Sequence, residues 1–246
     1  MSQDLNEILS LLKAMLKMVG IRGYDINNYR KVDTLKVSEV EQYLTNEKNN
    51  NILQYIKNVY EPGKIQLRIH LSRLFNYPNS NKKLFVYFTN RFPNVHTRDI
   101  NEFHNLYRII KEKLNITNLD AIMIGGSHLT GKEKDRFNEF VELHQNNIQY
   151  FTDEEIYFNP TEHIYSSDAR LLSLEERTKL LENNRFKVSQ MPATFTNDPL
   201  TKYLGANPND IIEYIRDTFA YAKQSNAPEM LVEKEIFYRI VKKAFD

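Results

Sequence analysis

The chain has 246 residues, of which 41% are apolar, a length and composition that fit two globular domains and exclude a disordered protein. Its formal net charge is +1 at pH 7, so the overall charge does not indicate a nucleic-acid partner, and any electrostatic site must be local. The absence of cysteine excludes disulfides, thiolate metal sites and cysteine nucleophiles, and it favours an intracellular protein. The N-terminal segment has early acidic residues and spaced apolar ones, so we expect neither a signal peptide nor a membrane span.

The first two thirds of the chain predict helices that alternate with strands. Apolar residues from Leu5 to Val19 recur at helical spacing, and Ser38-x-x-Glu41 has the spacing of a capping box before a second, short helix. In the segment 64–71 the apolar residues alternate strictly, which predicts a strand with a basic outer face. Further along, the pattern predicts buried strands at 84–88, 121–124 and 148–151, and helices at 100–114 and around 137–141.

This alternation of strands and helices, from residue 65 to 151, predicts an α/β domain with a partly parallel sheet. Asn159-Pro160 is a suitable boundary, because the residue before a proline rarely continues a helix. We therefore expect an α/β domain over 1–159 and a small α+β domain over 160–246.

The second domain contains clear helix signals. Ser173-x-x-Glu176 predicts a capped helix that runs through Leu181. Asp198-Pro199 predicts the start of a very short helix, with Gly205 just past its end. The closing elements are predicted as strands at 211–215 and 236–241.

The segment Gly126-Ser-His-Leu-Thr-Gly131-Lys132 follows a predicted strand and precedes a predicted helix, which is the setting of a phosphate-binding loop. The next residue is Glu133, at a position where Mg²⁺ ligation requires a hydroxyl group and where a carboxylate would repel phosphates. Because Thr130 and Glu133 have the spacing of a capping box, we interpret the segment as a helix start and not as a nucleotide site.

Other catalytic patterns are missing from the sequence. No Asp or Glu is followed two residues later by Lys, as metal-dependent nucleases usually require, and no two histidines have the i, i+4 spacing of a helical metal site. The Glu162-His163 pair is typical of a structural hydrogen bond, and no nucleophile-elbow motif occurs. We therefore expect no catalytic residue, no cofactor and no metal.

One local excess of positive charge lies between Lys57 and Lys83, where six Lys or Arg residues stand against a single acidic residue. A second, smaller cluster contains Lys132, Lys134 and Arg136. Such clusters fit an ordinary solvated face, or a shallow, sequence-independent surface that contacts phosphates. The residues alone leave both interpretations open.

The C-terminal third carries short motifs whose order and spacing are those of one family. The motifs are Thr161-Glu-His163, Leu174 to Leu181, Gln190-Met-Pro192, Asn197-Asp-Pro199, Lys202-Tyr-Leu-Gly205, Ile211 to Arg216 and Ile236-Phe-Tyr-Arg239. With them, this part of the chain resembles the shared fifth subunit of eukaryotic nuclear RNA polymerases, whose C-terminal domain alone is the archaeal H subunit. The N-terminal part is more loosely similar: Ile21–Tyr24, Leu84–Phe88 and the loop 126–132 look like the eukaryotic jaw domain.

The resemblance implies a non-catalytic subunit of a DNA-dependent RNA polymerase. Its C-terminal domain would bind the largest subunit beside neighbouring small subunits, and its jaw would approach downstream duplex DNA weakly and without sequence specificity; no membrane is involved. The 27 asparagines and 20 lysines favour a copy from a large DNA virus, in a cytoplasmic factory or virion, whereas a cellular copy would be nuclear. The residues expected near DNA are Lys64, Arg68, Ser127, His128, Thr130, Lys132 and Lys134. The residues expected at the subunit interface are Pro192, Asp198, Pro199, Tyr203, Gly205, Arg216, Tyr238 and Arg239.

Some features depart from the family pattern. Basic residues that are common in the family are replaced by Ala193-Thr194 and by the segment 207–210, which changes the expected charged contacts. The connection from Arg216 to Ile236 is longer than usual, so we expect an extra helix or a partner-specific contact there. The alternative function is a stand-alone nucleic-acid-binding protein that uses the basic face between Lys57 and Lys83.

Overall fold

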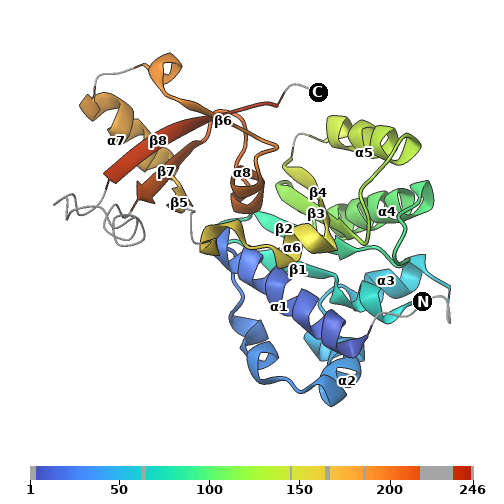
Figure 1. Ribbon diagram of the computed structural model, residues 1–246. Coiled ribbons are helices and arrows are strands. Elements are labelled where there is room, and N and C mark those ends of the chain that lie inside the picture. The colour runs from blue at the N-terminus through green and yellow to red at the C-terminus, as the bar shows by residue number, and fades with distance from the viewer. Residues whose placement is uncertain are drawn as a thin grey trace. The chain divides into compact units, whose positions relative to one another are not determined.

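The computed structural model describes residues 4–61, 65–144, 146–163, 167–184, 187–216 and 235–244. The chain divides between Phe158 and Asn159 into two compact units, which we call the N-terminal unit and the C-terminal unit (Figure 1). Each unit is built around its own four-stranded sheet.

The strands of the N-terminal unit are β1 (Arg73–Asn76), β2 (Lys83–Phe88), β3 (Leu119–Gly125) and β4 (Ile148–Thr152). They lie in this order in the sheet; β1 is antiparallel to β2, and β3 is parallel to both β2 and β4. Every residue of β3 is buried, as its nearly continuous apolar sequence requires of a strand covered on both faces. The predicted, partly parallel α/β sheet is confirmed.

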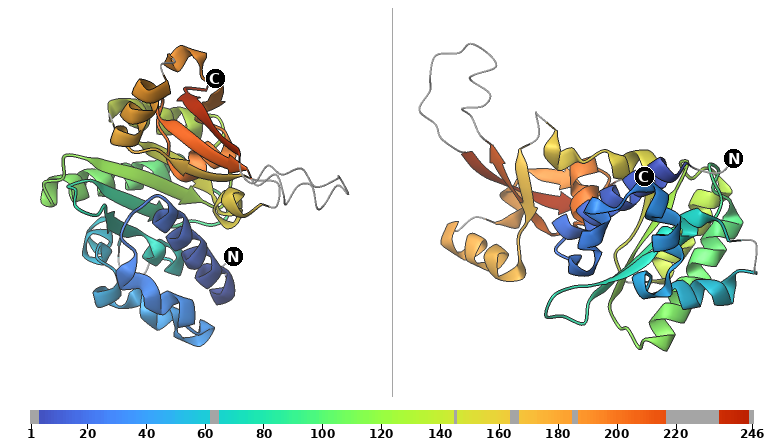
Figure 2. Two further views of the ribbon diagram at one scale, coloured as in Figure 1. Left: turned by 90° about the vertical axis from the view of Figure 1, so that its left-hand side faces the viewer. Right: turned by 90° about the horizontal axis from the view of Figure 1, so that it is seen from below.

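The helices of this unit are α1 (Leu5–Ile21), α2 (Val40–Thr45), α3 (Leu53–Val59), α4 (Thr97–Lys113), α5 (Lys132–Leu143) and α6 (Asp153–Tyr157). Short 3₁₀ segments lie at Asn27–Thr34, Val37–Glu39, Glu47–Asn49 and Leu67–Leu71. Figure 2 shows α1 on one side of the sheet and α4 with α5 on the other. The second predicted helix exists as α2. Its capping hydrogen bond lies two residues earlier than the predicted Ser38-x-x-Glu41: the Lys36 N–H donates to the Glu39 carboxylate (3.2 Å).

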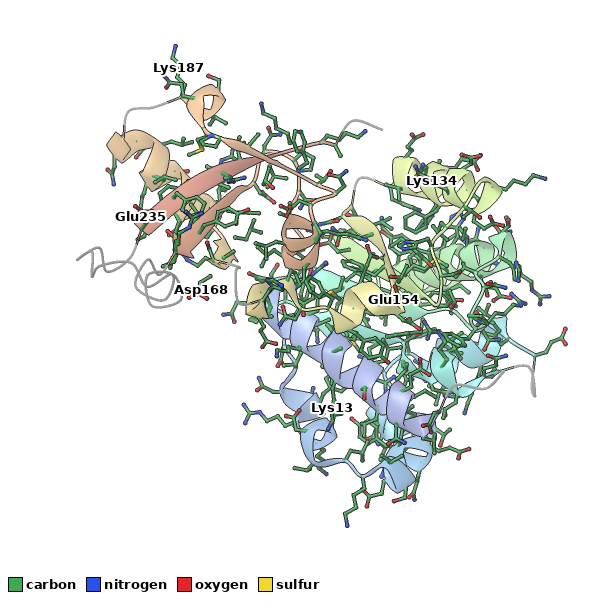
Figure 3. The ribbon with its side chains drawn as sticks, in the orientation of Figure 1. Lys13, Lys134, Glu154, Asp168, Lys187 and Glu235 are labelled. Atoms are coloured by element: carbon green, nitrogen blue, oxygen red, sulfur yellow. The ribbon has the colours of Figure 1, made fainter. Side chains whose placement is uncertain are left out.

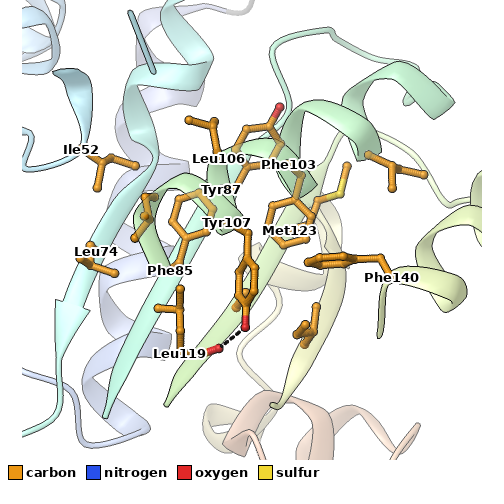
Figure 4. Close-up of a cluster of buried hydrophobic side chains, with 14 of the residues drawn as sticks. Ile52, Leu74, Phe85, Tyr87, Phe103, Leu106, Tyr107, Leu119, Met123 and Phe140 are labelled. Carbon is orange, nitrogen blue, oxygen red and sulfur yellow. Dashed lines mark hydrogen bonds between the residues drawn. The ribbon is translucent and has the colours of Figure 1, made fainter. Parts of the chain in front are cut away.

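Aromatic side chains fill the core between the sheet and α4 and α5 (Figure 4). Phe85 of β2 stacks on Phe103 of α4 with ring centroids 5.8 Å apart, and Phe140 of α5 meets Phe103 edge-on at 5.1 Å. The buried Tyr107 hydroxyl donates to the Leu119 carbonyl oxygen (2.9 Å), so its polar atom is satisfied within the apolar layer. These contacts fix α4 and α5 against β2 and β3, and β3 ends in the loop that leads into α5.

The strand predicted at 64–71 is wrong. The segment Leu67–Leu71 forms a 3₁₀ turn, and the strand begins only at Arg73. Arg68 was expected on a basic outer face, but it is 2% exposed and its guanidinium donates to the Asp153 carboxylate (2.7 Å). A tertiary ion pair therefore overrides the alternating pattern of this short segment.

The strands of the C-terminal unit are β5 (Asp168–Leu171), β6 (Ala193–Phe195), β7 (Ile211–Arg216) and β8 (Glu235–Lys242). Their order is β5-β7-β8-β6; β7 is antiparallel to β5 and β8, and β6 is parallel to β8. The two predicted strands are confirmed as β7 and β8. The edge strands β5 and β6, of four and three residues, were not predicted.

Two helices, α7 (Leu174–Asn184) and α8 (Pro199–Leu204), cover opposite faces of this sheet. Leu180 and Leu181 of α7 pack against Ile211 and Ile240, whereas α8 packs against the neighbouring, alternate positions of the same strands. Short 3₁₀ segments at Pro160–Glu162 and Val188–Gln190 complete the described part of the unit.

The capping box predicted for α7 is confirmed. The Ser173 N–H donates to the Glu176 carboxylate (2.8 Å), and the Glu176 N–H donates to the Ser173 hydroxyl (3.3 Å). Two backbone donors that have no partner within the helix are thereby satisfied.

Candidate functional site

The short helix α8 is held at both ends by its own sequence. The Asp198 carboxylate accepts hydrogen bonds from the N–H (3.0 Å) and the hydroxyl (3.1 Å) of Thr201, while Pro199 occupies a first-turn position where no N–H is needed. At the other end Gly205 has φ +71°, and its N–H donates to the Lys202 carbonyl oxygen (3.1 Å). The predicted helix is thus confirmed down to its caps.

The residues predicted for a subunit interface differ in their exposure. Tyr203 is 1% exposed and belongs to the core, so it can support an interface only by holding α8 in place. Asp198, Gly205 and Tyr238 are half-buried. The exposed members of the predicted set are Pro192, Pro199, Arg216 and Arg239.

One face of the sheet carries two stacked rings flanked by two arginines. Tyr214 of β7 and Phe237 of β8 are cross-strand partners, and their rings stack with centroids 5.0 Å apart and planes 6° apart. The Arg216 guanidinium lies 5.3 Å from the Phe237 centroid, and the Arg239 guanidinium lies 5.7 Å from the Tyr214 centroid. Sequence reasoning missed the two rings as site residues, although each strand carries the same aromatic-x-Arg spacing.

The opposite face of the sheet carries a network of charged side chains. Arg170 of β5 donates through Nε to Glu213 (2.7 Å) and through Nη1 to Glu176 (2.7 Å). Glu213 is the cross-strand partner of Tyr238. Burial and then the hydrogen bond with Glu213 raise the pKa of Tyr238, so this predicted interface residue is engaged within the chain.

The loop between β3 and α5 is held by close backbone contacts. A Cβ atom at Gly126 would lie 2.5 Å from the Pro93 carbonyl oxygen, so no side chain fits there. The Tyr150 hydroxyl donates to the Ser127 carbonyl oxygen. Gly126 therefore allows the loop to pack closely against the backbone at Pro93.

The capping box predicted at Thr130 and Glu133 is wrong. α5 follows Gly131, whose φ is +45°, and no side chain caps the first turn. The Glu133 N–H instead donates to the Thr130 carbonyl oxygen (3.0 Å), and the Glu133 carboxylate accepts from the Thr97 hydroxyl (3.5 Å). The permissive backbone of glycine lets the chain turn into the helix without a side-chain cap.

The loop and the first turn of α5 present a few polar groups to solvent. His128, Thr130, Lys132 and Lys134 are exposed, and Ser127 is half-buried; Figure 3 shows Lys134 on α5. Among the described residues, neither lysine has an ion-pair partner. The same turn carries acidic residues, so the surface offers individual cations and not a strongly positive patch.

The basic face predicted between Lys57 and Lys83 does not form in the described residues. Arg73 is 0% exposed and donates to the Ser72 carbonyl oxygen (2.8 Å), and Arg68 is buried as described above. Lys82 pairs with Asp120 at 2.8 Å. Lys64 lies outside the described residues. A stand-alone nucleic-acid surface on this segment is therefore not favoured.

Within the described residues, no group of three or more His, Asp or Glu side chains is placed to hold a metal ion. No helix in the same part of the chain has the length and apolar character needed to cross a membrane.

Comparison with known proteins gives matches to one family. The family model described as "RNA polymerase Rpb5, C-terminal domain" matches residues 158–225. The "DNA-directed RNA polymerase subunit Rpo5" of Pyrococcus abyssi is 44% identical over 59 residues, which are 24% of this chain and 72% of that protein. The Rpo5 of Thermococcus kodakarensis is 41% identical with the same coverage. The chain belongs to the RNA polymerase Rpb5 family.

A longer alignment includes both units of this Rpb5-family chain. The "DNA-directed RNA polymerases I, II, and III subunit rpabc1" of Dictyostelium discoideum is 23% identical over 214 residues, which are 87% of this chain and 92% of that protein. An alignment of this length must include much of the N-terminal unit. The family-model match contains α8 with its caps and also Arg216, whereas Tyr238 and Arg239 lie beyond it.

Proposed function

We propose that this Rpb5-family chain is a non-catalytic subunit of a multisubunit DNA-directed RNA polymerase. The observation that carries the proposal is the alignment with the Dictyostelium polymerase subunit, which covers 87% of the chain and so includes both units. The protein acts inside the cell, in the nucleus if its genome is cellular and in a cytoplasmic factory or virion if it is viral.

The C-terminal unit docks on the largest polymerase subunit and contacts neighbouring small subunits. Two exposed prolines, Pro192 and Pro199, bracket the edge strand β6 and the start of α8. Prolines lose little conformational freedom when they are covered, which favours them at a docking surface. The caps of α8 hold this surface in one conformation before any partner binds.

The N-terminal unit forms a jaw beside downstream duplex DNA. Its contact with DNA uses the loop that follows β3 and the two exposed lysines of α5, Lys132 and Lys134. Two lysines neutralise few phosphates, so the contact is weak, independent of base sequence and sensitive to salt.

The proposal is tested by isolating a tagged chain from its native source under gentle conditions. The large catalytic subunits should accompany it in a fixed ratio. Recovery as a free monomer would contradict the assignment.

The DNA contact is tested in the assembled polymerase by cross-linking to downstream DNA. Lys132→Gln combined with Lys134→Gln should weaken the cross-link at low salt. The control is Lys31→Gln combined with Lys113→Gln, an equal loss of charge at exposed positions of the 3₁₀ segment Asn27–Thr34 and of α4. Equal effects of the double variant and the control would show that the loop makes no specific contact.

A further inference from the structure

We propose that the two aromatic-x-Arg elements of β7 and β8 bind an acidic segment of a partner protein, with one carboxylate at Arg216 and another at Arg239. The inference names the chemistry of the assembly surface, and it rests on the proposed function only for the identity of the partner.

The register of the two strands places four side chains on one face. Tyr214 lies opposite Phe237, and each is followed two residues later by an arginine. In an antiparallel pair this arrangement puts the rings in the middle and one arginine at each end. Both guanidinium carbons lie close to the Phe237 ring, 5.3 Å from its centroid for Arg216 and 6.0 Å for Arg239.

The rings organise the two guanidinium groups for binding. A guanidinium group that lies over a ring keeps the N–H donors along its edge, and their fork matches the two oxygens of a carboxylate. Because the ring contacts restrict the long side chains beforehand, less rotamer freedom is lost when an anion binds. Lysine at these positions would lack the fork.

Neither arginine is neutralised within the described part of the chain. Arg216 and Arg239 are exposed and have no ion-pair partner there. Glu235 is the cross-strand partner of Arg216, yet the two side chains form no ion pair. On the opposite face Arg170 is held between two carboxylates, Glu176 and Glu213. The sheet therefore satisfies one arginine internally and leaves two for another molecule.

The spacing of the arginines suggests the form of the partner segment. Arg239 lies opposite Ile212, four residues before Arg216 on β7. Four residues of extended chain span about 13 Å between Cα atoms, and both guanidinium groups reach inward to within 6.0 Å of the Phe237 centroid. Carboxylates at positions i and i+4 of another extended segment can therefore meet them from the two outer ends. We expect an acidic-x-apolar-x-acidic pattern, with the apolar side chain over the half-buried Phe237 ring.

Charge favours a protein carboxylate over a nucleic-acid phosphate. From residue 159 to 246 the sequence has 12 Lys or Arg and 13 Asp or Glu, so this part of the chain has no positive excess to attract a polyanion. Two isolated cations on an apolar platform fit two carboxylates flanking an apolar side chain.

A zero-length cross-link tests the inference directly. The variants R216K and R239K each place an amine at the site, and a carbodiimide joins an amine to a carboxylate in direct contact. The full-length variants are isolated from the native source together with whatever proteins accompany them, treated with carbodiimide and mapped by mass spectrometry. Native Lys179 and Lys242, exposed in the same unit, report the background.

Each variant should give a new cross-link to an Asp or Glu of an accompanying protein, and both acceptors should lie in one short segment. Three results would overturn the inference: a cross-link confined to Glu235 of the same chain, the absence of any new cross-linked product, or the release of the accompanying partner by nuclease. The double variant R216Q/R239Q should also weaken partner binding about tenfold or more, as expected when charged hydrogen bonds are lost from an interface. The matched double variant K179Q/K242Q should change it less than about twofold.

The result separates this inference from the proposed function. If polymerase subunits accompany the chain but neither variant cross-links to them, only the inference fails. If other proteins accompany the chain and supply the carboxylates, the assignment to polymerase fails and the chemistry of the site stands.

Discussion

Arg68 and Asp153 form a buried ion pair that joins the 3₁₀ turn Leu67–Leu71 to the start of α6. Their side chains are 2% and 8% exposed. The guanidinium carbon also lies 5.5 Å from the ring centroids of both Phe88 and Phe92. Because two charges have been removed from water together, the loss of one leaves the other buried without compensation.

Replacing Arg68 with Met should therefore lower the free energy of unfolding by about 3–5 kcal/mol, measured by urea denaturation. The control is Arg136→Met, which removes an exposed partner of Glu139 on α5. That change should cost less than about 1 kcal/mol, because water screens the pair. Similar losses in the two variants would show that the buried pair is not specially important.

Glu176 gives a prediction about pH. The Ser173 N–H, and then the Arg170 side chain, hold the pKa of Glu176 at about 2, below its ordinary value of 4.5. A folded-state pKa that is lowered contributes stability above the unfolded value, and this contribution is lost as the pH falls from about 4.5 toward 2. The start of α7 should therefore weaken in that range.

An NMR titration of the Glu176 carboxyl group measures this pKa directly. In the wild type the midpoint should lie well below 4.5, and Ser173→Ala should raise it, because the capping hydroxyl is lost. A wild-type midpoint at the ordinary value would contradict the observed hydrogen bonds.

At the scale of single elements, α8 depends most on its caps. It has only six residues, so it cannot be stable without its caps and its packing. Asp198→Ala should destabilise α8 by about 1 kcal/mol, within the range measured for lost helix caps. Amide hydrogen exchange at Thr201 to Leu204 should become faster to match.

The neighbouring exposed residue provides the control for this change. Asn197→Ala removes a polar side chain that does not cap the helix, so exchange in α8 should stay near the wild-type rate. Equal acceleration by the two substitutions would mean that the cap does not hold the helix.

The elements that could be predicted from the sequence carry strong local signals. α7 and α8 were located by Ser173-x-x-Glu176 and by Asp198-Pro199, whose side chains act on backbone groups within a few residues. The edge strands β5 and β6 could not be found this way, because each is short and is defined by pairing with distant β7 or β8. The strand predicted at 64–71 is wrong for the same reason, because Arg68 of this segment pairs with the distant Asp153.

The candidate site was predicted in the same uneven way. The motifs predict Pro199, Gly205, Arg216 and Arg239 as site residues. The two rings between the arginines can be recognised only once β7 and β8 are paired. Tyr203 was named as an interface residue, but it belongs to the core. Sequence motifs mark residue types that a family retains, and burial decides which of them can touch a partner.

At the scale of the whole molecule, the chain is two units with separate sheets and a net charge of +1. So small a net charge gives no long-range attraction to DNA, and the exposed Lys132 and Lys134 supply only a local, short-range one. Membership of the Rpb5 family and the small size of the candidate contact surfaces in both units support the proposed role as a non-catalytic polymerase subunit.

The most direct test of that role is a native-mass measurement of the complex that a tagged chain brings down from its source. We predict one assembly that contains the large catalytic subunits of an RNA polymerase and this chain in a constant ratio across preparations. A chain recovered alone, or with proteins that are not polymerase subunits, would contradict the central claim.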